Sequence, residues 1–173
     1  MIDPRIFILD VDGVMTDGKF YYSAEGKVYK VFGADDADAL GLLKKYIDIR
    51  FITADKKGFS ISKKRIVEDM GYKLDLVSTI SRIEWIKNNY NLENVIFMGD
   101  GIFDHYVMRK VGYSISPNNA DKNTKLSAKY ITKNSGGDRA VAEACLHILK
   151  VFFEPYNPEE NINKKDITGE WSK

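Results

Sequence analysis

Two pairs of aspartates follow apolar segments of the chain, and the first pair has a spacing that suits chemistry at phosphorus. Asp10 and Asp12 lie two residues apart, directly after the apolar residues 6–9 and before Gly13. A carboxylate can attack phosphorus and form an acyl phosphate, which divides one difficult displacement into two steps. A second carboxylate beside it can protonate the departing alkoxide and then deprotonate the attacking water. The structural alternative is that both aspartates only form the turn before Gly13.

The second pair, Asp100 and Asp104, follows the apolar residues 95–98. We expect Asp100 to face Asp10 across a sheet, and two carboxylates held that close repel each other unless a dication lies between them. A site of oxygen ligands and several waters suits Mg²⁺, which would also neutralise phosphate oxygens. Asp104, one helical turn further on, would orient a metal-bound water or the Asp100 carboxylate. Taken alone, Asp100 could instead cap a helix.

Two further residues could hold a phosphate group. Thr53 ends the apolar segment 51–53, and its hydroxyl could donate to a phosphate oxygen. Arg82 lies on a predicted helix ahead of the residue 95–98 segment and could supply the cation that offsets the phosphate charge. Each has a simpler explanation, since Thr is common at strand ends and N-caps and most helix arginines are solvated.

The elements that must position these residues alternate along the chain. Short apolar segments predict buried strands at residues 6–9, 47–52, 74–77, 95–98 and 113–115. Segments with helical spacing predict helices at residues 37–46, 59–70, 80–90 and 103–111. This alternation favours a Rossmann-like, doubly wound α/β fold with a mainly parallel sheet. Ligands bind beyond the carboxyl ends of the strands in such sheets, where the candidate residues lie.

Residues 19–32 break the alternation and predict a β-hairpin inserted after the first strand, rich in aromatic and β-branched residues. An isolated two-stranded ribbon is marginal in water, so it must pack on its own core or against another subunit, and we favour the second. After a last helix predicted over residues 138–152, residues 153–173 are polar and contain two prolines. We expect one domain over residues 1–152 and a C-terminal tail over residues 153–173.

Composition excludes several classes of protein. A chain of 173 residues suits one domain, and 26 Lys+Arg against 25 Asp+Glu gives no global electrostatic case for binding nucleic acid or a membrane. The single cysteine, Cys145, excludes an intramolecular disulfide framework and a Cys-rich zinc site, so we expect a reducing cytoplasm. The apolar stretch before Asp10 is too short for a signal peptide or a membrane span.

These motifs come in the order DxD, Thr, Arg and GDxxxD, and the chain resembles the haloacid dehalogenase superfamily of phosphotransferases. It is most similar to the capless branch that contains 3-deoxy-D-manno-octulosonate 8-phosphate phosphatase and the nonulosonate 9-phosphate phosphatases. The opening LDVDGVLTDG of that branch is matched by residues 9–18, its hairpin by residues 19–32, and its GG-x-GAVRE ending by residues 136–143. The resemblance covers residues 5–150.

The resemblance implies a role for each candidate residue. Asp10 would be the nucleophile, Asp12 the general acid/base, and Thr53 with Arg82 the phosphate clamp. The implied Mg²⁺ ligands are Asp10, the main-chain carbonyl of Asp12, and Asp100, with Asp104 behind them. The resemblance also implies no cap domain, a homotetramer, and a Mg²⁺-dependent phosphomonoesterase that acts on a small phosphorylated sugar acid.

Two departures from the branch concern substrate recognition. Where the branch usually has Thr-Gly-Arg, residues 53–55 are Thr-Ala-Asp, and where it usually has Lys this chain has Arg82. Arg keeps the charge but replaces a compact ammonium with a broad fork. Asp55 would either repel a sugar-acid carboxylate or cap a helix that begins near Lys56. Lys56 is a further candidate substrate contact, and either it or Arg139 could restore the missing cation.

A non-catalytic role is the alternative. A very similar domain occurs fused to sialic-acid cytidylyltransferases, where it serves as an oligomerisation module. Loss of the carboxylates would be the sign of that role, and all four are present at positions 10, 12, 100 and 104. We therefore favour an enzyme.

Overall fold

The computed structural model describes residues 2–160. Most of the predicted C-terminal tail, residues 161–173, lies outside the described residues. Residues 154–160 are exposed and contain no helix or strand.

A six-stranded sheet forms the centre of the described chain, in the order β5-β4-β1-β6-β7-β8. Its strands are β1 (Ile6–Asp10), β4 (Asp48–Thr53), β5 (Lys73–Leu76), β6 (Val95–Met98), β7 (Tyr113–Ser116) and β8 (Tyr130–Ile131). Every neighbouring pair is parallel. From β1 the chain runs outward through β4 and β5 and then returns to the other side of β1 for the remaining strands. The predicted Rossmann-like, doubly wound α/β fold is confirmed.

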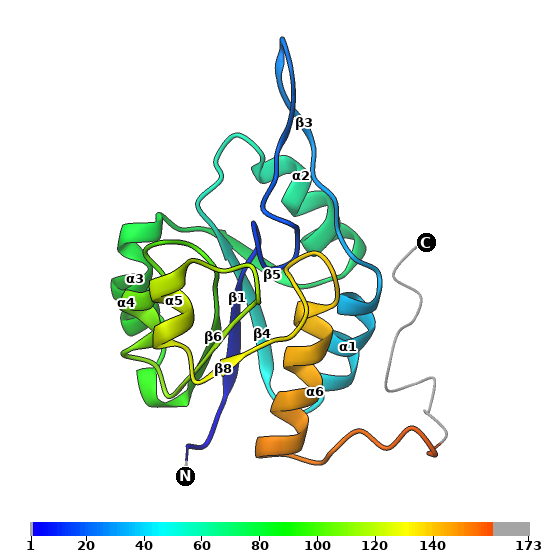
Figure 1. The fold of residues 1–173 in the computed structure, drawn as a ribbon, viewed down its shortest axis with the longest axis vertical. Helices are drawn as coiled ribbons and strands as arrows, with labels where there is room; N and C mark the ends of the chain where they lie inside the picture. The colour runs from blue at the N-terminus through cyan, green and yellow to red at the C-terminus, as the bar shows by residue number, and fades with distance from the viewer. Residues whose placement is uncertain (1, 161–173) are drawn as a thin grey trace.

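Helices cover both faces of the sheet (Figure 1). One face carries α1 (Asp35–Leu43), α6 (Ala140–Phe152) and α2 (Phe59–Lys63), which continues as the π-helix η1 (Lys64–Asp69). The other carries α3 (Arg82–Asn89), α4 (His105–Met108) and α5 (Lys122–Ser127). The 3-10 turns η2 (Thr79–Ser81) and η3 (Leu92–Asn94) flank α3.

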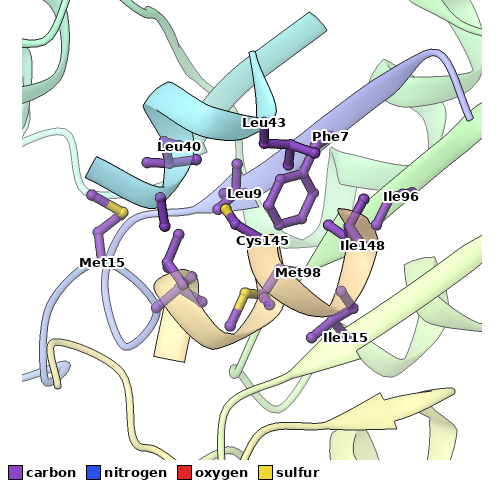
Figure 2. Close-up of a cluster of buried hydrophobic side chains, with 14 of the residues drawn as sticks. Phe7, Leu9, Met15, Leu40, Leu43, Ile96, Met98, Ile115, Cys145 and Ile148 are labelled. Atoms are coloured by element: carbon purple, nitrogen blue, oxygen red, sulfur yellow. The ribbon is translucent and has the colours of Figure 1, made fainter. Parts of the chain in front are cut away.

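The period-two geometry of the strands divides the core into two layers. Along β1, Phe7 and Leu9 enter the cluster beneath α1 and α6, whereas Ile6 and Ile8 enter the cluster beneath α3 and α4. Figure 2 shows the first cluster, with Phe7 and Leu9 close to side chains of α1 and α6. A strand covered on both faces must be apolar throughout. This requirement explains why residues 6–9 precede Asp10 without a polar residue.

The predicted hairpin is present and projects away from the sheet beyond the end of β1 (Figure 1). Its strands, β2 (Tyr21–Ser23) and β3 (Gly26–Tyr29), occupy only part of the predicted range 19–32. The rings of Tyr21 and Tyr29 stack with centroids 4.6 Å apart. Tyr22 stays 61% exposed in the single chain. Within residues 2–160 no separate cap domain is present.

Four elements differ from the sequence prediction. The predicted helix over residues 59–70 changes from α to π geometry at Lys64, and the helix predicted over residues 103–111 is only the four residues of α4. Helix α5 and strand β8 were not predicted, because residues 122–131 are mostly polar and lack periodicity. Local contacts fix α5 instead: the Asp121 side chain accepts hydrogen bonds from the amides of Asn123 and Thr124.

Candidate active site

The predicted site residues meet at the carboxyl ends of three neighbouring strands. Asp10 ends β1, Thr53 ends β4 and Asp100 follows β6 by two residues. These strands are adjacent and parallel, so their ends lie at one edge of the sheet. A hollow of about 410 Å³ opens there, and its lining includes Asp10, Asp12, Phe20, Asp55, Arg82, Asp100, Ile102, Phe103 and Asp104. Among the predicted site residues, those that line this hollow are Asp10, Asp12, Asp55, Arg82, Asp100 and Asp104. Thr53 contacts Asp12, and Lys56 does not line the hollow.

Arg82 lies at the first residue of α3 and is buried, with its side chain 2% exposed. Its Nη1 lies 2.7 Å from Asp10 Oδ2 and 2.5 Å from Asp104 Oδ1. The idea that Arg82 is an ordinary solvated helix residue is therefore wrong. A buried guanidinium is stable only when paired, and here two carboxylates pair with it.

Three carboxylates converge beside this guanidinium. One oxygen atom from each of Asp10, Asp100 and Asp104 lies within 4.8 Å of the others. Burial is the largest cause that raises the pKa of Asp10 to about 6, against the lowering effect of Arg82. Burial, with the charges of Asp10 and Asp104, raises the pKa of Asp100 to about 8.

This donor set fits a hard divalent cation. Asp100 Oδ1 is buried and has no hydrogen-bond partner, so it can ligate. The set consists of oxygen atoms, which are the ligands that Mg²⁺ prefers. Gly13 keeps the space open: its φ is +90°, and a Cβ there would lie 2.0 Å from Asp100 Oδ2.

Asp104 is tied to the main chain and to Arg82. Its Oδ2 accepts a hydrogen bond from the Gly101 amide at 2.9 Å, and its Oδ1 accepts from Arg82. It is therefore placed to fix the loop that carries Asp100.

Asp12 is held from two sides. Thr53 Oγ1 donates a hydrogen bond to Asp12 Oδ2 at 3.0 Å, and Lys30 Nζ lies 2.6 Å from Asp12 Oδ1. Thr53 also accepts a hydrogen bond from the Asp55 amide at 3.0 Å. The Thr53 hydroxyl thus contacts the candidate acid/base, a neighbour that the sequence did not reveal.

Asp55 has both an anchor and cationic partners. Its Oδ1 accepts a hydrogen bond from the Gly58 amide at 3.0 Å in the turn before α2. The capping hypothesis is wrong as stated, because α2 begins at Phe59 rather than near Lys56 and no side chain caps it. Its Oδ2 pairs with Lys27 and lies 2.9 Å from Lys30 Nζ. Burial works to raise the pKa of Asp55, but the hydrogen bonds from Lys27, Lys30 and Gly58 lower it to about 2.

The cations beside Asp55 are not the ones that the sequence suggested. Lys56 is exposed and Arg139 pairs with Asp35 at 2.6 Å, beside α1 and α6. Lys27 and Lys30 come instead from the hairpin segment. Two lysines three residues apart point to opposite faces of a regular strand, so their spacing did not predict that both would contact Asp55. They converge because β3 ends at Tyr29, before Lys30.

Two glycines near the C-terminal helix support the loop that carries Asp12. A Cβ on Gly136 would lie 1.8 Å from the carbonyl oxygen of Gly13. The Gly137 amide donates to the Val14 carbonyl at 3.1 Å, and its φ of +73° suits glycine. The close approach of two backbones explains the paired glycines at the start of the 136–143 motif.

Comparison with known proteins agrees with this geometry. Residues 12–144 match the model of the haloacid dehalogenase-like hydrolase family. The chain belongs to this family. Among curated relatives of this haloacid dehalogenase-like hydrolase, the 3-deoxy-D-manno-octulosonate 8-phosphate phosphatase of Escherichia coli is 32% identical over 153 residues, which cover 82% of this chain and 77% of the relative.

Two solved structures resemble this hydrolase along most of its length. The 3-deoxy-D-manno-octulosonate 8-phosphate phosphatase of Moraxella catarrhalis, in complex with magnesium, phosphate and KDO, superposes with a TM-score of 0.71 at 28% identity, covering 85% of this chain and 86% of that one. The phosphatase of the same name from Yersinia pestis gives a TM-score of 0.73 at 29% identity, covering 86% and 82%. The predicted superfamily and branch are confirmed, and the chain is a phosphatase.

Two other features of the described residues lie outside this site. A larger hollow, of about 1080 Å³, lies between α1 and α6, but no aspartate of the DxD or GDxxxD motif lines it. Among residues 2–160, no helix has the length and apolar character needed to cross a membrane.

Proposed function

We propose that this hydrolase is a Mg²⁺-dependent phosphomonoesterase that acts on a small phosphorylated sugar acid through an aspartyl-phosphate intermediate. The observation that carries the proposal is the convergence of Asp10, Asp12 and Asp100 around one hollow, with Arg82 buried against Asp10. The sugar-acid substrate is supported by relatives named as 3-deoxy-D-manno-octulosonate 8-phosphate phosphatases. The KDO molecule in the Moraxella catarrhalis structure adds to that support.

In the first step, a carboxylate oxygen of Asp10 attacks phosphorus. The bond between phosphorus and the ester oxygen breaks, and Asp12 donates a proton to the departing alkoxide. Arg82 holds Asp10 in place and offsets the negative charge that gathers there. The products are the free sugar and a phosphorylated Asp10.

In the second step, water attacks the phosphorus of the acyl phosphate. Asp12 accepts the proton of that water, the bond between phosphorus and Asp10 breaks, and inorganic phosphate leaves. Asp10 returns as a carboxylate and Asp12 as an acid, so the cycle closes with one water consumed.

Mg²⁺ would be held by Asp10, Asp100 and the main-chain carbonyl of Asp12, and when bound it neutralises charge on the phosphate oxygens. Asp104 would orient this site through the Gly101 amide. Asp55 lines the hollow and is kept as a candidate substrate contact, whereas Lys56 does not line it.

We also propose a homotetramer in which the hairpin of one subunit closes the site of another. Without a cap domain, an acyl phosphate needs some other cover against stray water. Tyr22, Val28 and Tyr29 are large apolar side chains left exposed on the hairpin. Such a surface suits a second copy of the chain better than solvent or nucleic acid.

The lone Cys145 is free and buried, which suits the reducing cytoplasm.

A screen of sugar phosphates with Mg²⁺ tests the proposal. The panel includes 3-deoxy-D-manno-octulosonate 8-phosphate, a nonulosonate 9-phosphate and neutral sugar phosphates, with Asp10→Asn as the control. We expect the unmutated chain to release phosphate from a sugar-acid phosphate and Asp10→Asn to release none. No release from any substrate would favour the oligomerisation module. Preference for neutral sugar phosphates would overturn the substrate class alone.

A further inference from the structure

Lys30 is a buried cation to which the reaction steps above assign no role. Its side chain is 0% exposed, and its ammonium has three polar partners. Nζ lies 2.6 Å from Asp12 Oδ1 and 2.9 Å from Asp55 Oδ2, and it donates to Ser62 Oγ at 2.9 Å. The contact with Ser62 is a hydrogen bond, and the contacts with Asp12 and Asp55 are ion pairs.

We propose that Lys30 is a positioning residue for Asp12, and that Asp55 and Ser62 hold Lys30 in the place where it does this. A general acid/base acts only when its carboxyl group lies within hydrogen-bond reach of the reacting oxygen. Asp12 could otherwise rotate, because its side chain is 16% exposed at the edge of the hollow. With Thr53 on Oδ2 and Lys30 on Oδ1, both torsions of the Asp12 side chain are fixed.

Asp55 is the fixed point of this arrangement. The Gly58 amide anchors its Oδ1, so the Oδ2 that faces the lysines has a defined position. Lys27 pairs with the same oxygen and lies 3.3 Å from the centroid of the Phe20 ring. A Cβ on Gly58 would lie 2.2 Å from Asp55 Oδ2 and 2.8 Å from Lys27 Cδ. Glycine at position 58 therefore leaves room for the cluster.

The arrangement gives the aspartate at position 55 a role other than repulsion of substrate. The carboxylate of Asp55 forms ion pairs with Lys27 and Lys30, both of which come from the hairpin segment. Lys30 directly follows β3, so the position of the hairpin and the orientation of Asp12 are linked through a single side chain. This inference rests on the proposed function, because it assigns a partner to the proposed acid/base.

The test compares two substrates that differ in their need for an acid. A sugar phosphate loses an alkoxide, which must be protonated, whereas p-nitrophenyl phosphate loses a phenolate that departs without a proton. The value of kcat/KM reports the first irreversible step. For the sugar phosphate that the screen finds to react fastest, we expect Lys30→Met to lower kcat/KM about 10- to 100-fold, which does not exceed the usual contribution of a general acid. For p-nitrophenyl phosphate we expect kcat/KM to fall less than about threefold.

Three further variants sharpen the comparison. Lys19→Met removes an exposed lysine of the same segment and should change neither value. Lys30→Arg keeps a charged donor and should recover part of the sugar-phosphate activity. Asp55→Asn can still accept from the Gly58 amide but loses the ion pair, and it should shift the substrate ratio in the same direction as Lys30→Met.

The outcomes separate the two proposals. Equal losses on both substrates, or an unchanged ratio in both Lys30→Met and Asp55→Asn, would overturn the positioning role while leaving the phosphatase in place. If Lys30→Met does not fold, as judged by thermal melting, the ratio in Asp55→Asn decides. If the unmutated chain hydrolyses neither substrate, the proposed function itself fails.

Discussion

The guanidinium of Arg82 lies 2.7 Å from the carboxylate of Asp10, and both side chains are almost fully buried. The two residues are 72 positions apart in sequence. They lie together because Asp10 is the last residue of β1 and Arg82 is the first residue of α3. A pair this deeply buried costs desolvation energy, so its net contribution to stability is small compared with the cost of removing one partner. The geometry suits a role in holding the proposed nucleophile, Asp10, in position.

Removal of the Arg82 cation should affect both folding and turnover. Arg82→Met leaves Asp10 and Asp104 facing each other in a buried site, which should cost about 3–5 kcal/mol in the free energy of unfolding. Arg82→Lys should keep more of the activity because the charge remains. Urea denaturation and phosphate release measure the two effects. Arg5→Met, which removes an exposed ion pair with Asp3, should cost less than about 1 kcal/mol; an equal cost would contradict the prediction.

Magnesium should stabilise the folded chain through the acidic cluster. At a free concentration near 100 times its dissociation constant, a ligand adds about 2.7 kcal/mol to the free energy of unfolding. We expect Mg²⁺ to raise the melting temperature of the unmutated chain and a chelator to reverse this. The rise should be lost in Asp100→Asn and kept in Asp17→Asn, which alters an aspartate outside the cluster. A rise of equal size in Asp100→Asn would exclude this site.

Asp36 should make stability depend on pH. It is fully buried, and its Oδ1 accepts a hydrogen bond from the Ala142 amide at 2.8 Å. Burial raises the pKa of Asp36 to about 6, above the ordinary value of 3.8. The folded chain therefore binds the Asp36 proton more tightly than the unfolded chain does. The contribution of Asp36 to the free energy of unfolding is most favourable below pH 4 and declines as pH rises through 6.

Asp36→Asn should remove that decline, because the amide stays neutral and can still accept from Ala142. Between pH 4.5 and pH 7.5, the unfolding free energy of Asp36→Asn should rise relative to that of the unmutated chain. The expected change is on the order of 1–3 kcal/mol. Urea denaturation at the two pH values measures it, and parallel pH dependences would contradict it.

Gly136→Ala should displace the loop that carries Asp12. A methyl group at this position would meet the Gly13 carbonyl oxygen at 1.8 Å, and neither backbone can yield without moving the site. We expect a loss of about 1–3 kcal/mol in stability and a larger proportional loss of activity. The neighbouring Ser135→Ala serves as the control. Unchanged turnover in Gly136→Ala would show that the loop position does not matter.

A charge on the hairpin should weaken the proposed tetramer. Tyr22 is 61% exposed in the single chain, so Tyr22→Asp should leave the subunit fold intact. We expect light scattering to show a smaller assembly and phosphate release to fall with it. Glu25→Gln, at the hairpin turn, provides a control of similar exposure. A stable monomer of the unmutated chain with full activity would exclude closure of the site by a neighbouring hairpin.

The sequence by itself determined five of the six strands of the sheet and the main candidate site residues. Buried parallel strands need unbroken apolar runs, and residues 6–9 and 95–98 supply them; each run also ends close to a pair of aspartates. Because parallel strands end at one edge, Asp10 and Asp100 could be placed together without coordinates. Helix α5 and strand β8 could not, since polar residues 122–131 take their shape from capping and from pairing with β7.

Only the tertiary structure decided which charges meet. The sequence indicated that Asp55 had replaced an expected cation, but Lys27 and Lys30 reach it from a segment more than 20 residues away. No sequence periodicity predicts these ion pairs, because they depend on where β3 ends and on how the hairpin leaves the sheet. The close contact of Gly136 with Gly13 is likewise a matter of two backbones touching. Local patterns specify elements, whereas side-chain partners depend on packing between elements distant in sequence.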